Sequence, residues 1–353
     1  TILHPRGVKI NKQEELKVKK VLVLVLALVM VMSFAACATS APAATATEEA
    51  TTAPAAAATE APAAAPEIHV AYIAKNTVDA FHATLNGAAK VALDAMVADG
   101  TIADWQLYDG QTDPIIQTNL IEDAINNGAN FVILLPAEAE GSAPVVSRCA
   151  EAGIPIIVVN SMTNNTTDLA TAFVGSNDVQ AGEMMAQFVL DKVPDGGKYA
   201  HMMGIVGNSA QIQRGEGIAN IMGAQSTWSS VGDFAADWSA DKAVSFATDV
   251  LTQYGDEIKA IICDNDDMSS AVQAYCNSVG RTDIVCIGVD GNAGPLQMVK
   301  DGTLLATVLQ DGAAQVTTAV SLIPDVIAGK TVEKSIMVPF TLVTSENVDQ
   351  YLK

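Results

Sequence analysis

The chain has 353 residues, half of them hydrophobic, which is enough to bury the cores of two domains. Its 40 acidic residues outnumber its 19 Lys and Arg, giving a formal net charge of −21. This balance argues against nucleic acid or anionic lipid as a ligand, because both are bound by basic patches.

Residues 1–37 are predicted to be an export signal. A lysine-containing segment precedes an uncharged apolar run over 21–36, and the run ends in small residues. The ending, 34–37, resembles the bacterial lipobox, in which Cys37 is lipidated and becomes the first residue of the mature protein. The protein would then be exported and held by a lipid anchor on the outer face of the cytoplasmic membrane. An uncleaved membrane anchor is the alternative, although the run is slightly short for a spanning helix.

Residues 38–66 are almost entirely Ala, Thr, Pro and Glu. Such a composition has no apolar periodicity and cannot bury a core, so we expect a disordered linker between the anchor and the folded part.

From Glu67 onward, short apolar runs alternate with amphipathic segments. We expect strands over 68–74, 105–108, 131–135 and 154–159, and helices over 81–99, 114–127 and 142–152. Successive strand–helix steps of this kind predict a parallel, doubly wound α/β sheet.

The pattern then restarts. We expect strands over 171–174, 199–206, 232–236, 260–263, 284–289, 304–309 and 338–343, and helices over 178–193, 210–228, 241–254 and 313–328, with further helices after 267 and after 290. The whole predicts two Rossmann-like lobes, each of about 130 residues.

Polar residues follow three successive strands of the second lobe. Asn265, Asp290 and Gln310 each stand where a buried apolar run stops. Ligands of open α/β sheets bind beyond the carboxyl ends of the strands, so these residues predict a small polar ligand held by amide and carboxylate groups.

Several motifs together resemble the periplasmic sugar-binding proteins of ABC importers, the type I group that includes the ribose- and galactose/glucose-binding proteins. They cover 210–217, 265–268 and 287–291, with support from 154–160 and 306–310, and the resemblance extends over about 67–353. It implies a neutral monosaccharide trapped between the lobes by hinge closure and delivered to an ABC permease. We expect a monomer.

The resemblance also implies the division of the chain. Residues 67–174 and 311–337 would form the N-terminal lobe, and 175–310 and 338–353 the C-terminal lobe. The chain would cross between them near Gly175, Gln310 and Val338.

Two aromatic side chains are implied to hold the sugar ring. Phe81 would stack on one face, with Asp79 accepting hydroxyl hydrogens beside it, and Trp238 would stack from the other lobe. The alternative for Phe81 is a core residue of its own helix.

The remaining implied ligand contacts are polar. Arg214 would donate two hydrogen bonds from its planar fork, unless it is an ordinary surface arginine. Asn160, Asn265 and Gln310 can donate and accept together, and Asp290 supplies a charged acceptor. Asn265 is also placed to cap the helix that follows it.

The sequence departs from the family at two corners. Leu135 stands where the ribose and galactose types carry Asn, which predicts a more apolar corner, and Ser161 stands where the ribose type has Arg. The calcium loop of the galactose type has no counterpart. Asp79 together with Trp238 favours a pyranose, although a deoxysugar, a pentose or a cyclitol would fit Leu135 equally well.

Other classes of protein are less well supported. A transcription repressor of the same fold would need a basic helix-turn-helix before the core. An enzyme is not expected, because catalytic motifs and cofactor motifs are missing and the acids at 264–267 have no His partner. No cysteine pair has metal-ligand spacing, so we expect no metal; buried thiols at Cys263 and Cys286 are the simplest interpretation, and a disulfide stays open. A sensor, or a binding protein for a nucleoside, a cyclitol or a furanosyl signal, is the alternative function.

Overall fold

The computed structural model describes residues 67–352. The predicted export signal with Cys37 and the linker up to residue 66 lie outside the described residues. The first of two lobes contains a six-stranded parallel sheet of order β12-β5-β4-β3-β1-β2. Its strands are β1 (His69–Ala74), β2 (Asp104–Asp109), β3 (Phe131–Leu134), β4 (Ile156–Asn160), β5 (Ala172–Gly175) and β12 (Ser335–Met337).

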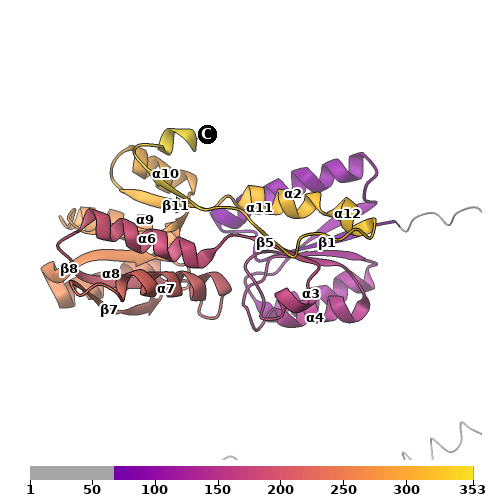
Figure 1. Ribbon diagram of the computed structural model, residues 1–353, viewed down its shortest axis with the longest axis horizontal. Coiled ribbons are helices and arrows are strands. Elements are labelled where there is room, and N and C mark those ends of the chain that lie inside the picture. Colours follow the sequence, from indigo (N-terminus) through magenta and orange to yellow (C-terminus); the bar gives the residue numbers. More distant parts are fainter. Residues whose placement is uncertain (1–66, 353) are drawn as a thin grey trace, which may run out of the picture. The chain divides into compact units, whose positions relative to one another are not determined.

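Helices cover both faces of this sheet (Figure 1). They are α2 (Ala80–Ala98), α3 (Pro114–Asn126), α4 (Ala143–Ala152), α5 (Thr166–Leu169), α11 (Gly312–Ser321) and α12 (Ile323–Ile327). Alternate residues of β1 point to opposite faces. Tyr72 belongs to the core under α2 and α11, and Ile73 to the core under α3 and α4. The inner strands β1, β3, β4 and β5 are therefore apolar on both sides, as the continuous runs in the sequence predict, whereas the edge strands β2 and β12 are partly exposed.

The second lobe has two sheets. A four-stranded parallel sheet of order β7-β6-β8-β9 lies beside a three-stranded sheet of order β10-β11-β13, in which β13 is antiparallel. The strands are β6 (Gly197–Met203), β7 (Trp228–Ala235), β8 (Ile258–Cys263), β9 (Val285–Ile287), β10 (Val289–Asp290), β11 (Ala306–Leu309) and β13 (Thr341–Thr344).

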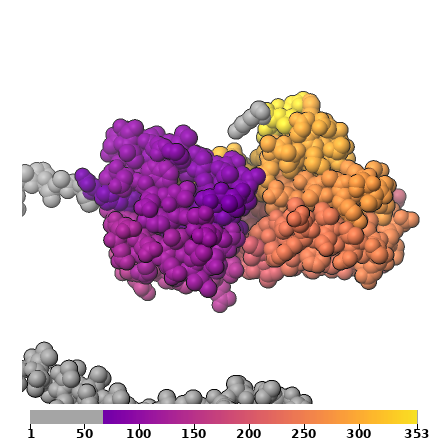
Figure 2. Space-filling model, turned by 180° about the vertical axis from the view of Figure 1, so that it is seen from behind, coloured from indigo at the N-terminus to yellow at the C-terminus, as the bar shows by residue number. Residues whose placement is uncertain are grey.

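Five α-helices pack on these sheets. They are α6 (Asp178–Lys192), α7 (Ser209–Met222), α8 (Ala240–Tyr254), α9 (Asp266–Ser278) and α10 (Ala293–Lys300), with short 3₁₀ turns at Gly255–Glu257 and Val348–Gln350. Figure 2 shows the division into two lobes on one face of the molecule, where indigo-to-magenta residues cover the first lobe and mainly orange and yellow residues cover the second.

Some predicted elements are wrong in their bounds. The expected strand 284–289 breaks at Gly288, because β9 and β10 belong to different sheets. A Cβ on Gly288 would lie 2.4 Å from the carbonyl oxygen of Asn265, so only glycine allows this close approach. The expected helix 210–228 ends at Met222, and Trp228 instead begins β7, where it pairs with Gly197.

The carboxyl-terminal elements also differ from prediction. The expected helix 313–328 is two helices, α11 and α12, and Pro324 lies in the first turn of α12, where its missing N–H costs nothing. The expected strand 338–343 starts only at Thr341. Before it, β12 has joined the first lobe, beside β5.

The chain passes between the lobes three times: from β5 to α6, from β11 to α11, and from β12 to β13 (Figure 1). Within residues 67–352, no helix combines the length and the apolar character that crossing a bilayer demands.

Candidate ligand-binding site

A cavity of about 390 Å³ lies where strand ends and helix amino ends of both lobes meet. All eight side chains expected to bind ligand line it: Asp79, Phe81, Asn160, Arg214, Trp238, Asn265, Asp290 and Gln310. Parallel strands present their carboxyl ends at one edge of a sheet, which is why residues so distant in sequence come together here.

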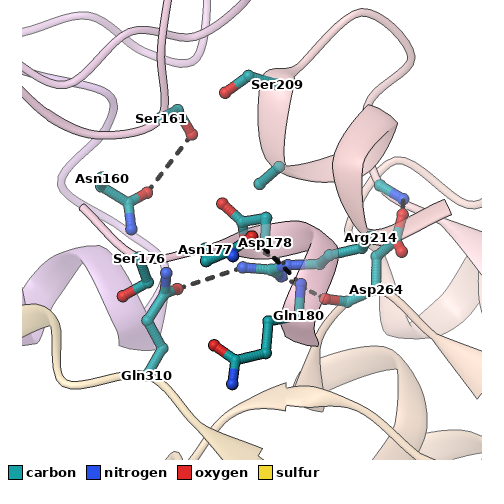
Figure 3. A network of polar contacts seen from close by, with 12 residues as sticks. Asn160, Ser161, Ser176, Asn177, Asp178, Gln180, Ser209, Arg214, Asp264 and Gln310 are labelled. Carbon is teal, nitrogen blue, oxygen red and sulfur yellow. Dashed lines mark hydrogen bonds and ion pairs between the residues drawn. The ribbon is translucent and has the colours of Figure 1, made fainter. Parts of the chain in front are cut away.

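Arg214 is the centre of the polar network in Figure 3. Its Nε donates to Asp178 Oδ1 at 2.9 Å, Nη1 donates to the backbone carbonyl of Asp264, and Nη2 donates to Gln310 Oε1 at 3.2 Å. Only 3% of the residue is exposed, so it is not a surface arginine. A guanidinium has five N–H groups, and two therefore remain for a ligand.

Asp178 on α6 and Gln310 after β11 are tied to this arginine. Burial raises the pKa of Asp178, and the charge of Arg214 opposes that rise only in part. Because Arg214 can only donate, it fixes the oxygen end of the Gln310 amide toward itself. The amide nitrogen of Gln310 then lines the cavity as a donor.

Asp79 caps α2 and holds a histidine that the sequence analysis missed. Asp79 Oδ1 accepts from the backbone N–H of His82 at 2.7 Å and lies 2.9 Å from His82 Nδ1, while Oδ2 accepts from Asn76 at 2.6 Å. Burial would raise the pKa of Asp79, but the hydrogen bonds that its carboxylate accepts from His82 and Asn76 outweigh burial and hold the pKa below its usual range.

Trp238 stands on an unusual backbone. Its φ of 65° is left-handed, and its ring lies over Gly204, where a Cβ would come within 2.1 Å of the indole. Lys75 Nζ is 5.1 Å and Arg214 Cζ 5.9 Å from the ring centroid. Part of the electron-rich surface of the indole thus already meets cations. Stacking on a sugar stays a prediction for this residue.

Phe81 is in contact with the core, which was its alternative role, and its stacking on a sugar stays a prediction. The ring is half-buried, packs against the core of the first lobe, and also lines the cavity. Asn265 likewise caps α9 by accepting from the backbone N–H of Met268 at 3.1 Å and lines the cavity as well.

Asn160, whose φ of 70° is also left-handed, begins a relay of hydrogen bonds. Its Nδ2 donates to Gln315 Oε1 at 3.0 Å, Gln315 Nε2 donates to Ser176 Oγ at 2.7 Å, and Ser176 Oγ donates to the carbonyl of Val338 at 2.7 Å. Since the Val338 carbonyl can only accept, the direction of every bond follows, and the Asn160 oxygen stays outside the relay and accepts from the Ser161 hydroxyl at 3.5 Å (Figure 3).

Asp290 lies beside a second buried carboxyl group. Asp266 accepts from the backbone N–H groups of Gly291 and Asn292 and from the Thr307 hydroxyl, yet burial raises its pKa to about 6. Burial and then Asp266 raise the pKa of Asp290 well above its usual range, although Arg214 opposes this. The prediction of a simple charged acceptor at Asp290 is therefore incomplete, because its charge depends on these neighbours.

Lys75 is a further cavity residue that the sequence analysis missed. It directly follows β1, so the strand-end argument applied to the second lobe would have found it in the first. It is 5% exposed, and burial lowers its pKa to about 8. Leu135, in contrast, is buried in the core of the first lobe and does not line the cavity. The apolar corner expected there is wrong.

The acids at 264–267 do have a histidine partner, which corrects the sequence analysis. His201 on β6 lies 2.9 Å from Asp264 Oδ1 through Nε2 and 3.0 Å from Asp233 Oδ1 through Nδ1. Burial would lower the pKa of His201, but the two carboxylates raise it to about 9. Among residues 67–352, no cluster of three or more His, Cys, Asp or Glu is arranged to hold a metal ion. The four cysteines of this part are free and buried.

The fold and the cavity are those of a two-lobed binding protein, with a cavity whose size and polar lining suit a small polar ligand. The chain belongs to the family described as periplasmic binding protein domain, whose model matches residues 70–331.

Curated relatives agree with this assignment. A ribose import binding protein of Bacillus subtilis is 31% identical over 68% of this chain and 77% of its own length. A xylitol-binding protein of Mycolicibacterium smegmatis is 28% identical over 66% of each chain. Among solved structures, an ABC transporter solute-binding protein of Bacillus halodurans with bound myo-inositol has a TM-score of 0.75 and 29% identity, covering 81% of this chain and 97% of that one.

Proposed function

We propose that this protein is an extracytoplasmic substrate-binding protein that captures a neutral monosaccharide or related polyol and delivers it to an ABC importer. The observation that carries the proposal is the cavity itself. Amides, carboxylates, a guanidinium and two aromatic rings from both lobes surround a volume suited to one small ring. Hydroxyl groups donate and accept together, and the cavity offers both kinds of partner.

The charges around the cavity favour a neutral ligand. Lys75 and Arg214 supply two cationic side chains, while four carboxylic side chains also line it: Asp79, Asp237, Asp267 and Asp290. A phosphorylated or acidic sugar would bring a further negative charge beside these acids, which costs free energy in a desolvated site.

Ligands bound by two similar proteins indicate which class of ligand to propose for this one. The B. halodurans structure holds myo-inositol, and a solute-binding protein of Agrobacterium vitis, 27% identical with a TM-score of 0.73 over 80% of this chain and 97% of that one, holds D-fucose. Together with the preference for a pyranose drawn from Asp79 and Trp238, these two structures lead us to place a pyranose or a cyclitol first, ahead of the ribose and the xylitol for which two other relatives are named.

We propose that capture works by hinge closure between 67–174 with 311–337 and 175–310 with 338–353. Several contacts join the lobes around the cavity in this structure, and three hydrogen bonds are among the shortest of those that involve the backbone. Ala139 N donates to the Gly207 carbonyl at 2.9 Å, the Asn208 side chain donates to the Ala137 carbonyl at 2.9 Å, and Met162 N donates to Ser209 Oγ at 2.7 Å. These bonds would form on closure and stabilise the closed state.

The setting of the protein follows from the proposal. We propose export by the signal at 1–37, a lipid anchor on Cys37, and a monomer held by the linker 38–66 close to its ABC permease. Three relatives that are 27–31% identical to this chain carry importer or solute-binding names, which favours delivery over sensing.

The test is a thermal-shift screen of protein that has been unfolded and refolded to remove bound ligand. The panel contains pyranoses, pentoses, xylitol, myo-inositol, deoxysugars and nucleosides. A ligand that binds only the folded state raises the melting temperature by mass action, by about 2.7 kcal/mol of stability at 100 times Kd. A response to one polyol supports the proposal. Responses to nucleosides alone would contradict it.

A further inference from the structure

Three buried polar nitrogens have no hydrogen-bond partner among residues 67–352: His82 Nε2, Trp238 Nε1 and Gln310 Nε2. All three residues line the cavity. A buried polar atom without a partner costs about 1–3 kcal/mol, so native proteins seldom keep one without a function. Three in one cavity indicate that a ligand completes them.

The hydrogen-bond polarity of His82 is set by its neighbour. The carboxylate of Asp79 can only accept, so the His82 Nδ1 that lies 2.9 Å from it carries the hydrogen. A neutral imidazole has one N–H, and Nε2 is then a bare acceptor. The opposite tautomer would place two lone pairs face to face between Nδ1 and Asp79.

The ring is neutral at physiological pH. Burial lowers the pKa of His82, the nearby charge of Lys75 lowers it further, and Asp79 only partly opposes them. Asp79 comes from the cap of α2 and Lys75 from the end of β1, and the ring of Phe81 packs edge-on at 5.4 Å between centroids. His82 is 6% exposed, so water does not substitute freely for a ligand.

We propose that His82 Nε2 accepts the hydrogen of a ligand hydroxyl, and that the Asp79–His82 pair determines specificity at this end of the cavity. This inference rests on the proposed function and assigns a residue to it. Asp79 already accepts three hydrogen bonds, so it acts on the ligand mainly by orienting and polarising the ring of His82.

The other two nitrogens have the opposite polarity. Trp238 Nε1 can only donate, and Gln310 presents its NH₂ end because Arg214 holds its oxygen. The ligand must therefore offer one hydroxyl hydrogen to His82 and oxygen lone pairs to Trp238 and Gln310. An analogue that lacks the hydroxyl facing His82, or carries a methyl ether there, leaves Nε2 unpaired and binds more weakly.

The first arm of the experiment needs no ligand. Nitrogen-15 NMR of histidine-labelled protein at pH 7 reports the tautomer of each imidazole. We expect a neutral His82 with hydrogen on Nδ1 and none on Nε2. A hydrogen on Nε2 in the wild-type protein would overturn the inference, whatever the ligand proves to be.

The second arm measures the affinity of the polyol that responds in the screen, together with its deoxy and O-methyl analogues. His82→Phe keeps a ring of similar size without an acceptor, and His82→Gln keeps an acceptor. The matched control is His69→Asn, since His69 is a partly exposed histidine of β1 outside the cavity.

We expect His82→Phe to weaken binding at least tenfold, His82→Gln to recover part of the loss, and His69→Asn to leave affinity unchanged. The deoxy analogue that lacks the hydroxyl facing His82 should bind equally well to the wild type and to His82→Phe, because the hydrogen bond to His82 is absent from both complexes. Equal affinity of wild type and His82→Phe for the parent polyol would refute the role of His82 and leave the proposed function intact. A wild type that responds to no polyol would overturn the proposed function instead.

Discussion

The ion pair between Arg214 and Asp178 allows a structural role to be separated from a binding role. Both side chains are only 4% exposed, and Arg214 Nε donates to Asp178 Oδ1 at 2.9 Å. Arg214→Met keeps an unbranched apolar stem but removes the guanidinium, which leaves the carboxylate without its cation. It also removes the two N–H groups that donate to the Asp264 carbonyl and to Gln310 Oε1.

Removing one member of a buried pair costs about 3–5 kcal/mol, because the other charge remains desolvated. Asp178 can relieve part of this cost by taking up a proton, since burial already raises its pKa. A group with a raised folded pKa favours folding at low pH, and this contribution is lost as pH rises through the folded pKa. The destabilisation by Arg214→Met is therefore expected to grow from pH 5 to pH 8.

The double variant Arg214→Met with Asp178→Asn removes the charge that is left alone. We expect it to recover at least half of the lost stability, while ligand binding stays abolished because the two N–H groups free for the ligand are gone. Urea unfolding followed by circular dichroism measures stability, and calorimetry with the responding polyol measures binding. If the double variant is as unstable as Arg214→Met, the cost does not come from Asp178, and the reasoning fails.

Three further perturbations follow from the site. Gly204→Ala places a Cβ against the Trp238 ring and should cost about 1–3 kcal/mol of stability together with a change in near-ultraviolet circular dichroism; an unchanged aromatic spectrum would contradict this packing. Lys75→Met should stabilise the ligand-free protein at pH 7 by about 1–3 kcal/mol. The pKa of Lys75 is lowered from 10.5 to about 8 in the folded protein, so below pH 8 the charge on the buried amine opposes folding in full. Urea midpoints at pH 7 and pH 10 test whether the stabilisation becomes smaller at high pH. The ion pair of His201 with Asp264 should add about 3 kcal/mol to the free energy of unfolding of the wild type below pH 6.5, and this contribution should be lost as the pH rises through 9. His201→Gln should therefore destabilise the protein more at pH 6 than at pH 10, and equal destabilisation at both would be evidence against the ion pair.

The strand-end argument predicted much of the site because it depends on topology alone. Asn265 and Gln310 follow parallel strands, and any parallel sheet collects such residues at one edge. Family resemblance added Phe81 and Trp238, whose places in loops and first turns carry little signal of their own. All of these residues line one cavity.

The pairing of charges could not be predicted in the same way. Arg214 and Asp178 are 36 residues apart, and His201 and Asp264 are 63 apart, so each pair depends on how two helices or two strands pack. His82 was missed because a residue in the first turn of a helix is usually interpreted through its apolar face. The role of His82 becomes visible only in the structure, where Asp79 caps the helix and contacts Nδ1 of the imidazole.

The ends of two predicted elements were wrong because apolar spacing alone does not mark them. Apolar spacing continues across Gly288 and across Gly223, so periodicity alone joins segments that the structure separates. The decisive contacts, such as the Asn265 carbonyl beside Gly288, come from residues distant in the sequence.

The relay from Asn160 through Gln315 and Ser176 to Val338 has a consequence for how affinity can evolve. It joins a cavity side chain to the Ser176 hydroxyl and the Val338 carbonyl, and these two residues belong to two of the three connections between the lobes. A substitution at Gln315 would shift the balance between lobe positions without touching the bound molecule. Selection could then adjust how tightly the protein holds its cargo, and how readily it gives the cargo up, while the groups that recognise the cargo stay the same.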